Sequence, residues 1–288
     1  MSAEKNILVL GASGMLGNAV FRFFSIKPQF NVFGTIRSLG ATTLLLKHSL
    51  NGLISGIDVE GDENVIQAFE IAQPDIVINC IGLVKQLAVA NEPYSAISIN
   101  AFLPHRLARL CKVFGSRLIH MSTDCVFSGD RGMYSENDES DATDLYGRSK
   151  YLGEVNYPWG ITLRTSIIGH ELSGSHSLLN WFLNQQDSVS GYRRAIFSGM
   201  PTVEVARIIH DYVIPNPHLH GVYNLAASPI SKYELLKLVS NTYNKDIDII
   251  PDDSVAINRS LNGSRFNQAT GFSPKSWSTL VREMREFG

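Results

Sequence analysis

The chain has 288 residues, of which 44% are hydrophobic and 18% are charged, a composition typical of a soluble globular enzyme. Its 25 basic and 27 acidic side chains nearly cancel. This balance excludes a broad basic surface for nucleic acid and a polybasic membrane anchor. A few local arginines and lysines must therefore hold any anionic ligand.

Cysteines, histidines and the first apolar run exclude further classes of protein. The three cysteines, Cys80, Cys111 and Cys125, lack CxxC spacing, which favours reduced thiols over a disulfide framework or a zinc site. The histidines are scattered without metal-ligand spacing, so no bound metal is expected. The apolar run near the start of the chain is too short for a signal peptide or a membrane span. We therefore expect a cytoplasmic protein without a membrane partner.

Short apolar runs alternate with helical patterns over the first part of the chain. The runs predict strands at 6–10, 31–36, 76–80, 117–121 and 161–168. The patterns between them predict helices at 15–25, 64–72, 93–114 and 145–157. Continuously apolar strands separated by helices indicate parallel strands that are buried on both faces. The expected fold class is α/β, with a doubly wound parallel sheet of the Rossmann type.

The alternation loosens after Gly169. Helical patterns occur at 178–186, 203–213 and 232–243, strand-like runs at 221–225 and 246–250, and a polar, loop-like stretch at 251–271. We interpret residues 1–169 as a dinucleotide-binding domain, to which segments at about 203–225 return. Residues 170–288 would then form mainly a smaller substrate-binding lobe.

A glycine-rich turn follows the first predicted strand and opens the first predicted helix. Glycines there permit a tight turn and let the backbone approach a pyrophosphate at the helix amino terminus. The spacing is GxxGxxG rather than GxGxxG, and a glycine turn between strand and helix is common in itself. Its place at the start of a βαβ unit favours a cofactor site formed by Gly11, Ser13, Gly14, Met15, Leu16 and Gly17.

The end of the second predicted strand indicates which cofactor is bound. An acid there bonds the ribose hydroxyls of NAD, whereas an arginine accommodates a 2′-phosphate. This segment contains no acid and ends on Arg37, which favours NADPH (NADP), although a solvated surface arginine is the alternative. Asp58 and Val59 follow the next apolar run and are candidates to flank the adenine; an aspartate in such a place is often only a helix cap.

Tyr146 and Lys150 are four residues apart, so on a helix they project from one face. A neighbouring ammonium stabilises a phenolate and lets a phenol act as a general acid or base nearer neutrality. The YxxxK pattern alone is weak, because exposed helix faces often produce it. Upstream, Ser122 and Thr123 end a predicted strand, where a hydroxyl can bond a substrate carbonyl. Together with the glycine turn, these residues predict hydride transfer to a carbonyl.

These motifs resemble the extended short-chain dehydrogenase/reductases. The glycine turn, Asn79 after the strand at 76–80, the Ser122-Thr123-Asp124 run and the Tyr146–Lys150 pair all match that family. Within it, the run 122–154 is similar to the dTDP-4-dehydrorhamnose reductase branch, as are the segments 163–166, 199–202 and 259–262. The resemblance extends over nearly the whole chain.

The resemblance implies roles for individual residues. Tyr146 would donate the proton, Lys150 would assist it and hold the nicotinamide ribose, and Thr123 would orient the carbonyl. Cys80, Ile81, Gly82 and Asn100 would lie at the cofactor, although a buried structural role for Asn100 is an equal alternative. Arg259 matches the arginine that meets the substrate's diphosphate. Looser candidates, which are as readily ordinary surface charges, are Arg193, Arg194 and Arg265.

Two segments depart from the branch where the hexose should bind. After Asn79 the branch is alanine-rich, whereas this chain has a longer apolar stretch that ends in Lys85 and Gln86. Cys125 stands where the branch has a tyrosine after the Ser-Thr-Asp run. Lys85 is a candidate substrate contact, with a plain loop lysine as the alternative. The identity of the sugar therefore stays open.

The expected activity is NADPH-dependent reduction of the 4-keto group of a nucleotide-diphospho-6-deoxyhexulose, either dTDP-4-dehydrorhamnose or a UDP-linked analogue, for deoxysugar biosynthesis. A nucleotide-sugar epimerase on the same scaffold is one alternative. The other is a non-catalytic, NADP-binding regulatory subunit, like the one that accompanies methionine adenosyltransferase. The expected partner is the nucleotide-sugar substrate, and a homodimer is one candidate for the oligomeric state, which the sequence leaves open.

Overall fold

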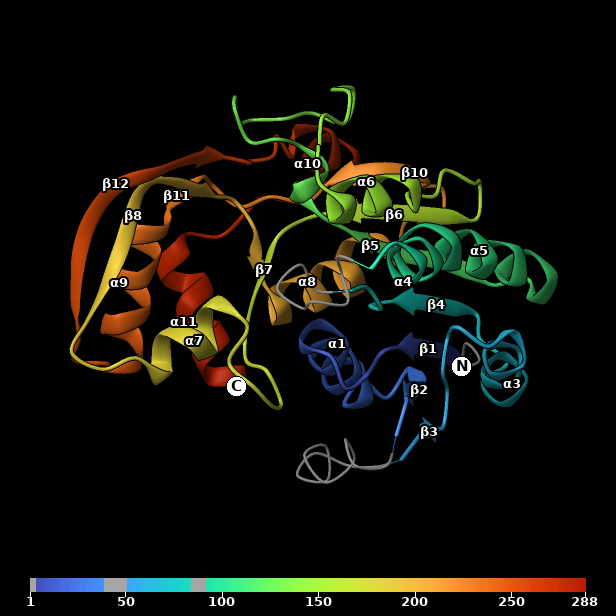
Figure 1. Cartoon of the computed structure of the whole chain (residues 1–288). Coiled ribbons are helices and arrows are strands. Elements are labelled where there is room, and N and C mark those ends of the chain that lie inside the picture. Colours follow the sequence, from blue (N-terminus) through green and yellow to red (C-terminus); the bar gives the residue numbers. More distant parts are fainter. Residues whose placement is uncertain (1–3, 39–50, 84–91) are drawn as a thin grey trace.

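The computed structural model describes residues 4–38, 51–83 and 92–288. Its centre is a seven-stranded parallel sheet (Figure 1). The strands are β1 (Lys5–Leu10), β2 (Phe30–Ile36), β3 (Leu53–Ser55), β4 (Ile76–Asn79), β5 (Arg117–Ser122), β6 (Gly160–Arg164) and β10 (Gly221–Asn224). They lie in the order β10-β6-β5-β4-β1-β2-β3. The direction of winding reverses between β1 and β4, and ligands of open α/β sheets bind at the carboxyl ends of such strands.

Helices cover both faces of this sheet because its strands are apolar on both sides. On one face Ile7 and Val9 pack with α1 (Met15–Ser25) and α8 (Thr202–Ile208). On the other, Leu8 and Leu10 pack with α3 (Asp62–Ala72) and α5 (Leu103–Phe114). Successive residues of a strand point to opposite faces, so a continuous apolar run is what two helical layers require. The predicted doubly wound sheet is confirmed.

The helix predicted at 93–114 is continuous but not uniform. It begins as α4 (Pro93–Ser95), widens into the π-helical segment η4 (Ala96–Phe102) and continues as α5. A π-helical turn inside an α-helix frequently marks a functional site. Asn100 lies in this segment and is buried. Helix α6 (Leu145–Leu152) packs directly against η4.

A second, three-stranded sheet forms a smaller lobe beside the first (Figure 1, left). Strand β8 (Ser188–Phe197) lies at its centre, antiparallel to β11 (Ile230–Ser231) and parallel to β12 (Asp248–Asn258). The remaining elements are η5 (Asp124–Val126), β7 (Ile167–Ile168), α7 (Leu178–Asn184), β9 (Met200–Pro201), η6 (Ile209–Val213), α9 (Lys232–Tyr243), α10 (Ser264–Thr270) and α11 (Trp277–Phe287).

Three predicted elements differ from the structure. The prediction of a loop at 251–271 is wrong, because β12 extends to Asn258 through pairing with β8 and α10 follows. The strand predicted at 161–168 is interrupted: β6 ends at Arg164, and β7 pairs with β9 outside the main sheet. The helix predicted at 145–157 ends at Leu152, with Gly153 as its carboxyl-terminal cap.

The chain returns to the main sheet after the first strand of the smaller lobe. Helix α8 packs against α1, and β10 adds the last strand next to β6. Within the described ranges, no helix is both long and apolar enough to span a membrane.

Candidate active site

The glycine turn after β1 packs so closely on the start of α1 that side chains at two of its glycines would collide with neighbouring atoms. Gly11 has a φ of +83°, and a Cβ placed on Gly17 would lie 2.0 Å from the Gly11 carbonyl oxygen. Gly14 caps α1, whose first turn contains no acidic residue. The helix dipole and the backbone N–H groups of this turn therefore favour an anion at its end. The geometry fits the pyrophosphate of a dinucleotide, as the spacing predicts.

Strand β2 is tied to this turn by Thr35, a residue that the sequence analysis missed. The Thr35 side-chain oxygen accepts a hydrogen bond from Gly11 N at 3.1 Å, and its carbonyl accepts one from Ala12 N at 2.9 Å. Thr35 itself is buried. A threonine at the penultimate position of a strand gives no signal of this contact in the sequence alone.

The residues predicted to choose the cofactor lie beyond this strand. Arg37 directly follows β2 and is exposed, so its guanidinium is accessible to a ligand. The Asp58 carboxylate accepts a hydrogen bond from Glu60 N at 3.1 Å, within the turn that precedes α3. Val59 is buried in the core, and its carbonyl accepts from Arg106. These contacts of Asp58 and Val59 are those of a turn, and their role at an adenine stays a prediction.

The segment after β4 connects the glycine turn to Lys150. A Cβ on Gly11 would approach Ile81 Cγ1 to 2.8 Å, whereas a Cβ on Gly82 would lie 3.5 Å from Lys150 Nζ. Two asparagines shape the segment: Asn79 Oδ1 accepts from Ile81 N at 3.1 Å, and Asn100 Oδ1 accepts from Leu83 N at 2.9 Å. Cys80 precedes Ile81 in the same segment and is half-buried. Lys85 lies outside the described residues.

Helix α6 brings Tyr146 to Thr123 because a glycine follows the tyrosine. A Cβ on Gly147 would lie 2.3 Å from the Cys125 carbonyl oxygen, so only glycine permits this approach to η5. Asp144 caps the helix and accepts a hydrogen bond from Gly147 N at 2.8 Å. The Thr123 side chain lies near enough to the Tyr146 hydroxyl to act on its pKa. Thr123 Oγ1 itself donates to Asp124 Oδ1 and accepts from Cys125 N, both at 3.1 Å.

Lys150 lies one helical turn after Tyr146 and is buried. Its Nζ donates a hydrogen bond to the Met121 carbonyl oxygen at 2.7 Å. Burial lowers the pKa of Lys150 from 10.5 to about 8, while the charges of Glu154 and Cys80 oppose that shift. The ammonium is therefore retained at neutral pH, although at a cost in free energy.

The expected lowering of the phenol pKa by Lys150 is wrong for this structure. Tyr146 is half-buried, and the loss of hydration raises the pKa of its phenol well above the usual value. The negative charge of Cys125 would raise it further, and the nearby Thr123 side chain only partly opposes the increase. A phenol in this setting stays protonated and can donate, which is the state that reduction of a carbonyl requires.

Arg259 lies close to the turn that holds Thr123. Its Nε donates to the Phe127 carbonyl oxygen at 2.8 Å, and its positive charge acts on the buried Asp124. Burial raises the pKa of Asp124 despite that charge. An arginine from the segment after β12 thus reaches the carboxyl end of β5.

The looser arginine candidates lie elsewhere on the surface of the protein. Arg193 is ion-paired with Asp253, and Arg194 is its exposed neighbour on β8. Arg265 is exposed and lies over the Tyr223 ring, with its guanidinium carbon 4.8 Å from the ring centroid. Their contact with a substrate stays a prediction.

A buried ion pair beside the site was not predicted. Arg164 donates two hydrogen bonds to Glu154, at 2.7 and 2.6 Å, and the hydroxyl of Ser122 donates a third at 2.8 Å. Ser122 is therefore turned inward, and Thr123 is left as the hydroxyl next to Tyr146. The sequence contains all three residues within runs that resemble one enzyme branch, but no spacing rule indicates that they meet.

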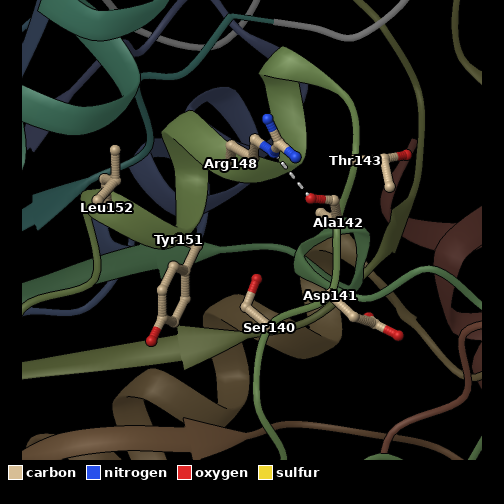
Figure 2. A pocket seen from close by; sticks show the side chains of 7 residues that line it. All are labelled: Ser140, Asp141, Ala142, Thr143, Arg148, Tyr151 and Leu152. Carbon is tan, nitrogen blue, oxygen red and sulfur yellow. Dashed lines mark hydrogen bonds between the residues drawn. The ribbon is translucent and has the colours of Figure 1, made fainter.

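One open pocket lies on the outer side of α6 (Figure 2). Arg148, Tyr151 and Leu152 line it from the helix, and the segment 140–143 lines it from the facing loop. Arg148 Nε donates to the Ala142 carbonyl oxygen at 3.1 Å across it. None of the candidate catalytic residues lines this pocket, so it is separate from the Tyr146–Lys150 face of the helix.

Side chains that could ligate a metal ion do not cluster in the described part of the chain. Among those residues, no three His, Cys, Asp or Glu side chains form a group that could hold a metal ion. The site is built instead from a hydroxyl, a phenol, an ammonium and a glycine turn.

Two curated proteins illustrate what this chain is similar to. Methionine adenosyltransferase 2 subunit beta of Danio rerio is 27% identical over 254 residues, which cover 83% of this chain and 74% of that protein. The dTDP-4-dehydrorhamnose reductase of Mycolicibacterium smegmatis is 32% identical over 152 residues, which cover 52% of this chain and 40% of the reductase. The match to the reductase thus spans less than half of its length.

The fold is also found among solved structures. The dTDP-4-dehydrorhamnose reductase of Bacillus anthracis str. Ames, solved in complex with NADP, superposes with a TM-score of 0.80 and 19% identity over 99% of both chains. At this identity the likeness concerns the fold. Residues 5–286 match the family described as the RmlD substrate binding domain, and the chain belongs to that family.

Proposed function

We propose that the protein is an NADPH-dependent reductase that acts on the 4-keto group of a nucleotide-diphospho-6-deoxyhexulose. The observation that carries this proposal is the proximity of Tyr146 on α6 to Thr123 after β5, with the buried Lys150 one turn away. The glycine turn follows β1, which is separated from β5 by β4. The Mycolicibacterium smegmatis relative named as a dTDP-4-dehydrorhamnose reductase supports the substrate class.

The cofactor would be held by groups from the ends of β1, β2 and β4 and from α6. The turn at Gly11–Gly17 would bind the pyrophosphate, Arg37 the 2′-phosphate, and Lys150 the nicotinamide ribose beside Cys80, Ile81 and Gly82. Asn100 fixes Leu83 and so orients this segment. When bound, NADPH supplies the hydride. The close packing of Gly11 and Gly17, which leaves the backbone N–H groups of the turn at the amino terminus of α1, is the feature that fits such a cofactor.

The protein's own residues would carry out the proton chemistry. Thr123 would bond the carbonyl oxygen and hold it next to Tyr146. The phenol would then donate its proton to that oxygen as negative charge develops there, and Lys150 would stabilise the resulting phenolate. Arg259 would bind the substrate's diphosphate, because it reaches the same end of β5 from the smaller lobe.

A regulatory subunit is a second candidate function. The match to methionine adenosyltransferase 2 subunit beta covers 83% of this chain, which is more than the 52% covered by the match to the Mycolicibacterium smegmatis reductase. In that case the same site would bind NADP without turning over a sugar.

The deciding experiment is an NADPH oxidation assay with a panel of 4-keto dTDP- and UDP-sugars, followed by identification of the product. We expect stoichiometric NADPH consumption with at least one sugar. Tyr146→Phe should lower kcat by about 10²–10⁴-fold, because it removes the proton donor and keeps the ring. Tyr151→Phe, on the outer side of the same helix, is the matched control and should be unaffected.

Three outcomes would contradict the proposal. A protein that binds NADPH and reduces no sugar favours the regulatory subunit. A changed sugar without net NADPH consumption indicates an epimerase. Full turnover by Tyr146→Phe removes the tyrosine from the mechanism.

A further inference from the structure

A buried charge network lies directly behind the proposed reaction site. Arg164 on β6 and Glu154 after α6 form a two-pronged ion pair, and both side chains are only 4% exposed. The Ser122 hydroxyl donates to the same Glu154 oxygen that accepts from Arg164 Nε. The pair thus joins three elements, the ends of β5, α6 and β6, at one point.

Stability alone does not explain this pair. Taking two charges out of water costs several kcal/mol per ion, and well-packed apolar residues in place of a buried ion pair are often neutral or stabilising. Arg164 Nη1 is also buried, and no protein group within the described ranges accepts a hydrogen bond from it. Burying a donor in this way adds to the cost. A role in geometry or electrostatics accounts better for a pair placed here.

The network fixes two consecutive residues at the end of β5. Lys150 Nζ holds the Met121 carbonyl, and Glu154 holds the hydroxyl of the next residue, Ser122. Thr123 follows at once and faces Tyr146. Because the two contacts come from the same end of α6, they set the position of Thr123 relative to that helix.

The network also extends toward the proposed diphosphate arginine. The Arg164 guanidinium carbon lies 5.2 Å from the centroid of the Phe127 ring, on the face where a cation is attracted to an aromatic ring. The carbonyl of Phe127 accepts the hydrogen bond from Arg259. One chain of contacts therefore runs from Ser122, through Glu154, Arg164 and Phe127, to Arg259.

Three charged or titratable groups act on Lys150, each from a different element. Glu154 follows α6 and its negative charge supports the ammonium, as does Cys80 at the end of β4 when it is ionised. His120 on β5 is fully buried, and the charge of Lys150 lowers the pKa of this histidine. Since burial also raises the pKa of Cys80, to about 12, that thiol is neutral at physiological pH. Glu154 is then the anion that faces Lys150.

We propose that Glu154, held by Arg164, is a positioning residue of the hydride-transfer site. It sets Thr123 against Tyr146 through Ser122 and keeps Lys150 charged in a buried setting. Arg164 neutralises the remaining charge of Glu154 and links the pair to Phe127 and Arg259. This inference rests on the proposed function for its kinetic consequence, but its effect on Lys150 does not.

The first test reads Lys150 directly and needs neither NADPH nor sugar. Lysine side chains are labelled with ¹³C, the Lys150 signal is assigned by its loss in Lys150→Met, and its titration is followed by NMR. Glu154→Gln should lower the midpoint by about one pH unit or more, because an opposite charge nearby typically shifts a pKa by about 1–3 units. Glu204→Gln removes a carboxylate that is equally buried but lies on α8, paired with Lys275, and should not move it.

The second test measures kinetics on the sugar that the wild-type protein reduces. Glu154→Gln should lower kcat about 10- to 100-fold with a smaller change in KM, since it misplaces Thr123 rather than removing a binding group. Ser122→Ala should lower kcat without moving the Lys150 midpoint. In the Lys150→Met protein, Glu154→Gln should lower kcat by a smaller factor than it does in the wild-type protein, because the effects of substitutions at interacting residues are not additive.

The outcomes separate this inference from the proposed function. An unchanged Lys150 midpoint in Glu154→Gln overturns the inference, whatever the protein reduces. Equal losses of kcat and of Tm in Glu154→Gln and Glu204→Gln also overturn it, because they indicate a purely structural role. If no sugar is reduced, the proposed function fails and the NMR titration still decides the electrostatic role of Glu154.

Discussion

Loss of hydration moves the pKa values of Lys150 and Tyr146 in opposite directions. It lowers the pKa of the ammonium and raises that of the phenol, so each neutral form is favoured. The phenol stays a proton donor without help. The ammonium needs the carboxylate of Glu154 to stay charged near neutrality. The free-energy cost of the site therefore falls mainly on Lys150.

We expect Lys150→Met to stabilise the folded protein at neutral pH. Below pH 8 the lysine is protonated in both the folded and the unfolded chain, so the cost of burying the ammonium is fully present. Between pH 8 and 10.5 the folded chain releases the proton first, and the cost disappears. The shift of the Lys150 pKa from 10.5 to about 8 means that the buried ammonium destabilises the folded protein by roughly 3 kcal/mol at neutral pH. Lys150→Met removes this cost but also removes the hydrogen bond to Met121, which contributes about 1 kcal/mol.

The measurement is urea unfolding of both proteins at pH 7 and pH 10. The gain of Lys150→Met should be larger at pH 7. Lys5→Met, at an exposed position on β1, is the control. Its free energy of unfolding relative to the wild-type protein should be the same at pH 7 and at pH 10. A gain that does not depend on pH would refute the assignment of the buried ammonium.

Arg37 provides a second prediction for a single side chain. It is exposed directly after β2, near the turn that would hold the pyrophosphate. A charge-assisted hydrogen bond to a phosphate is worth roughly 1.5–3 kcal/mol, so Arg37→Ala should lower NADPH affinity by about one to two powers of ten. NADH affinity should stay the same. Fluorescence titration with both cofactors measures this, with the exposed Arg148→Ala as control; equal NADPH and NADH affinities of the wild-type protein would contradict it.

Helix α6 is positioned by two glycines at its contact surfaces. Gly147 lies under the Cys125 carbonyl, and Gly153 lies next to the carbonyl of Asn100, where a Cβ would approach to 1.9 Å. One glycine sets the distance of the helix from η5, and the other its distance from η4. The helix that carries Tyr146 and Lys150, the proposed catalytic pair, is therefore held between two backbone segments that cannot move aside as a side chain can.

Gly147→Ala should separate α6 from η5. The added methyl group would lie 2.3 Å from a backbone oxygen, and such overpacking typically costs about 1–3 kcal/mol. The better helix propensity of alanine offsets about 1 kcal/mol of this. We expect a lower Tm and a loss of turnover beyond that seen in Gly160→Ala, whose nearest contact of 3.5 Å is an ordinary one. A Gly147→Ala protein with wild-type turnover would show that the close approach is not required.

The elements of the first half could be predicted because each is defined by its own apolar period. Strands β1, β2, β4 and β5 are apolar on both faces, which short-range patterns reveal. Strand β8 carries two successive exposed arginines, Arg193 and Arg194, and β12 is mostly exposed, so neither strand has a continuous apolar run. These two strands exist because they pair with each other, and pairing partners sixty residues apart leave no local signal.

The residues of the candidate site likewise divide into those in local motifs and those that meet only in the folded protein. Tyr146, Lys150, Thr123 and the glycine turn lie in local motifs and could be located from the sequence. The Glu154–Arg164 pair and the contacts of Thr35 join separate segments, so they depend on the tertiary fold. The raised pKa of Tyr146 has the same origin, since burial outweighs the neighbouring charges.

In the described part of the chain, polar contacts that join distant segments of the two lobes include a cluster of ion pairs and a backbone hydrogen bond. Glu204 on α8 is ion-paired with Arg207 and with Lys275, and both of these cations also pair with Glu283 on α11. On the other side, the Tyr134 N–H donates to the Ser260 carbonyl at 2.9 Å, next to Arg259. The arginine is thus carried by the segment where the smaller lobe meets the main sheet.

We expect Arg259→Ala to affect sugar binding and leave cofactor binding intact. Arg259 contacts Phe127 after β5, whereas the glycine turn follows β1. Loss of a charged contact to a diphosphate should raise the sugar's KM by about one to two powers of ten. Steady-state kinetics with a reduced sugar and NADPH titration measure the two effects. Arg282→Ala, exposed on α11, is the control, and unchanged values for Arg259→Ala would make this residue a surface charge.

Strand β10 completes the main sheet late, and this has a consequence during synthesis. Gly221 of β10 pairs with Ile161 of β6, sixty residues earlier in the chain. At about 5–20 residues per second, a ribosome needs roughly 3–12 s to add that interval. During this time β6, all of whose residues are buried in the folded protein, has one unpaired edge, the kind of edge that recruits strands from other chains. We therefore expect this edge to be open to pairing with other chains while residues 165–220 are translated.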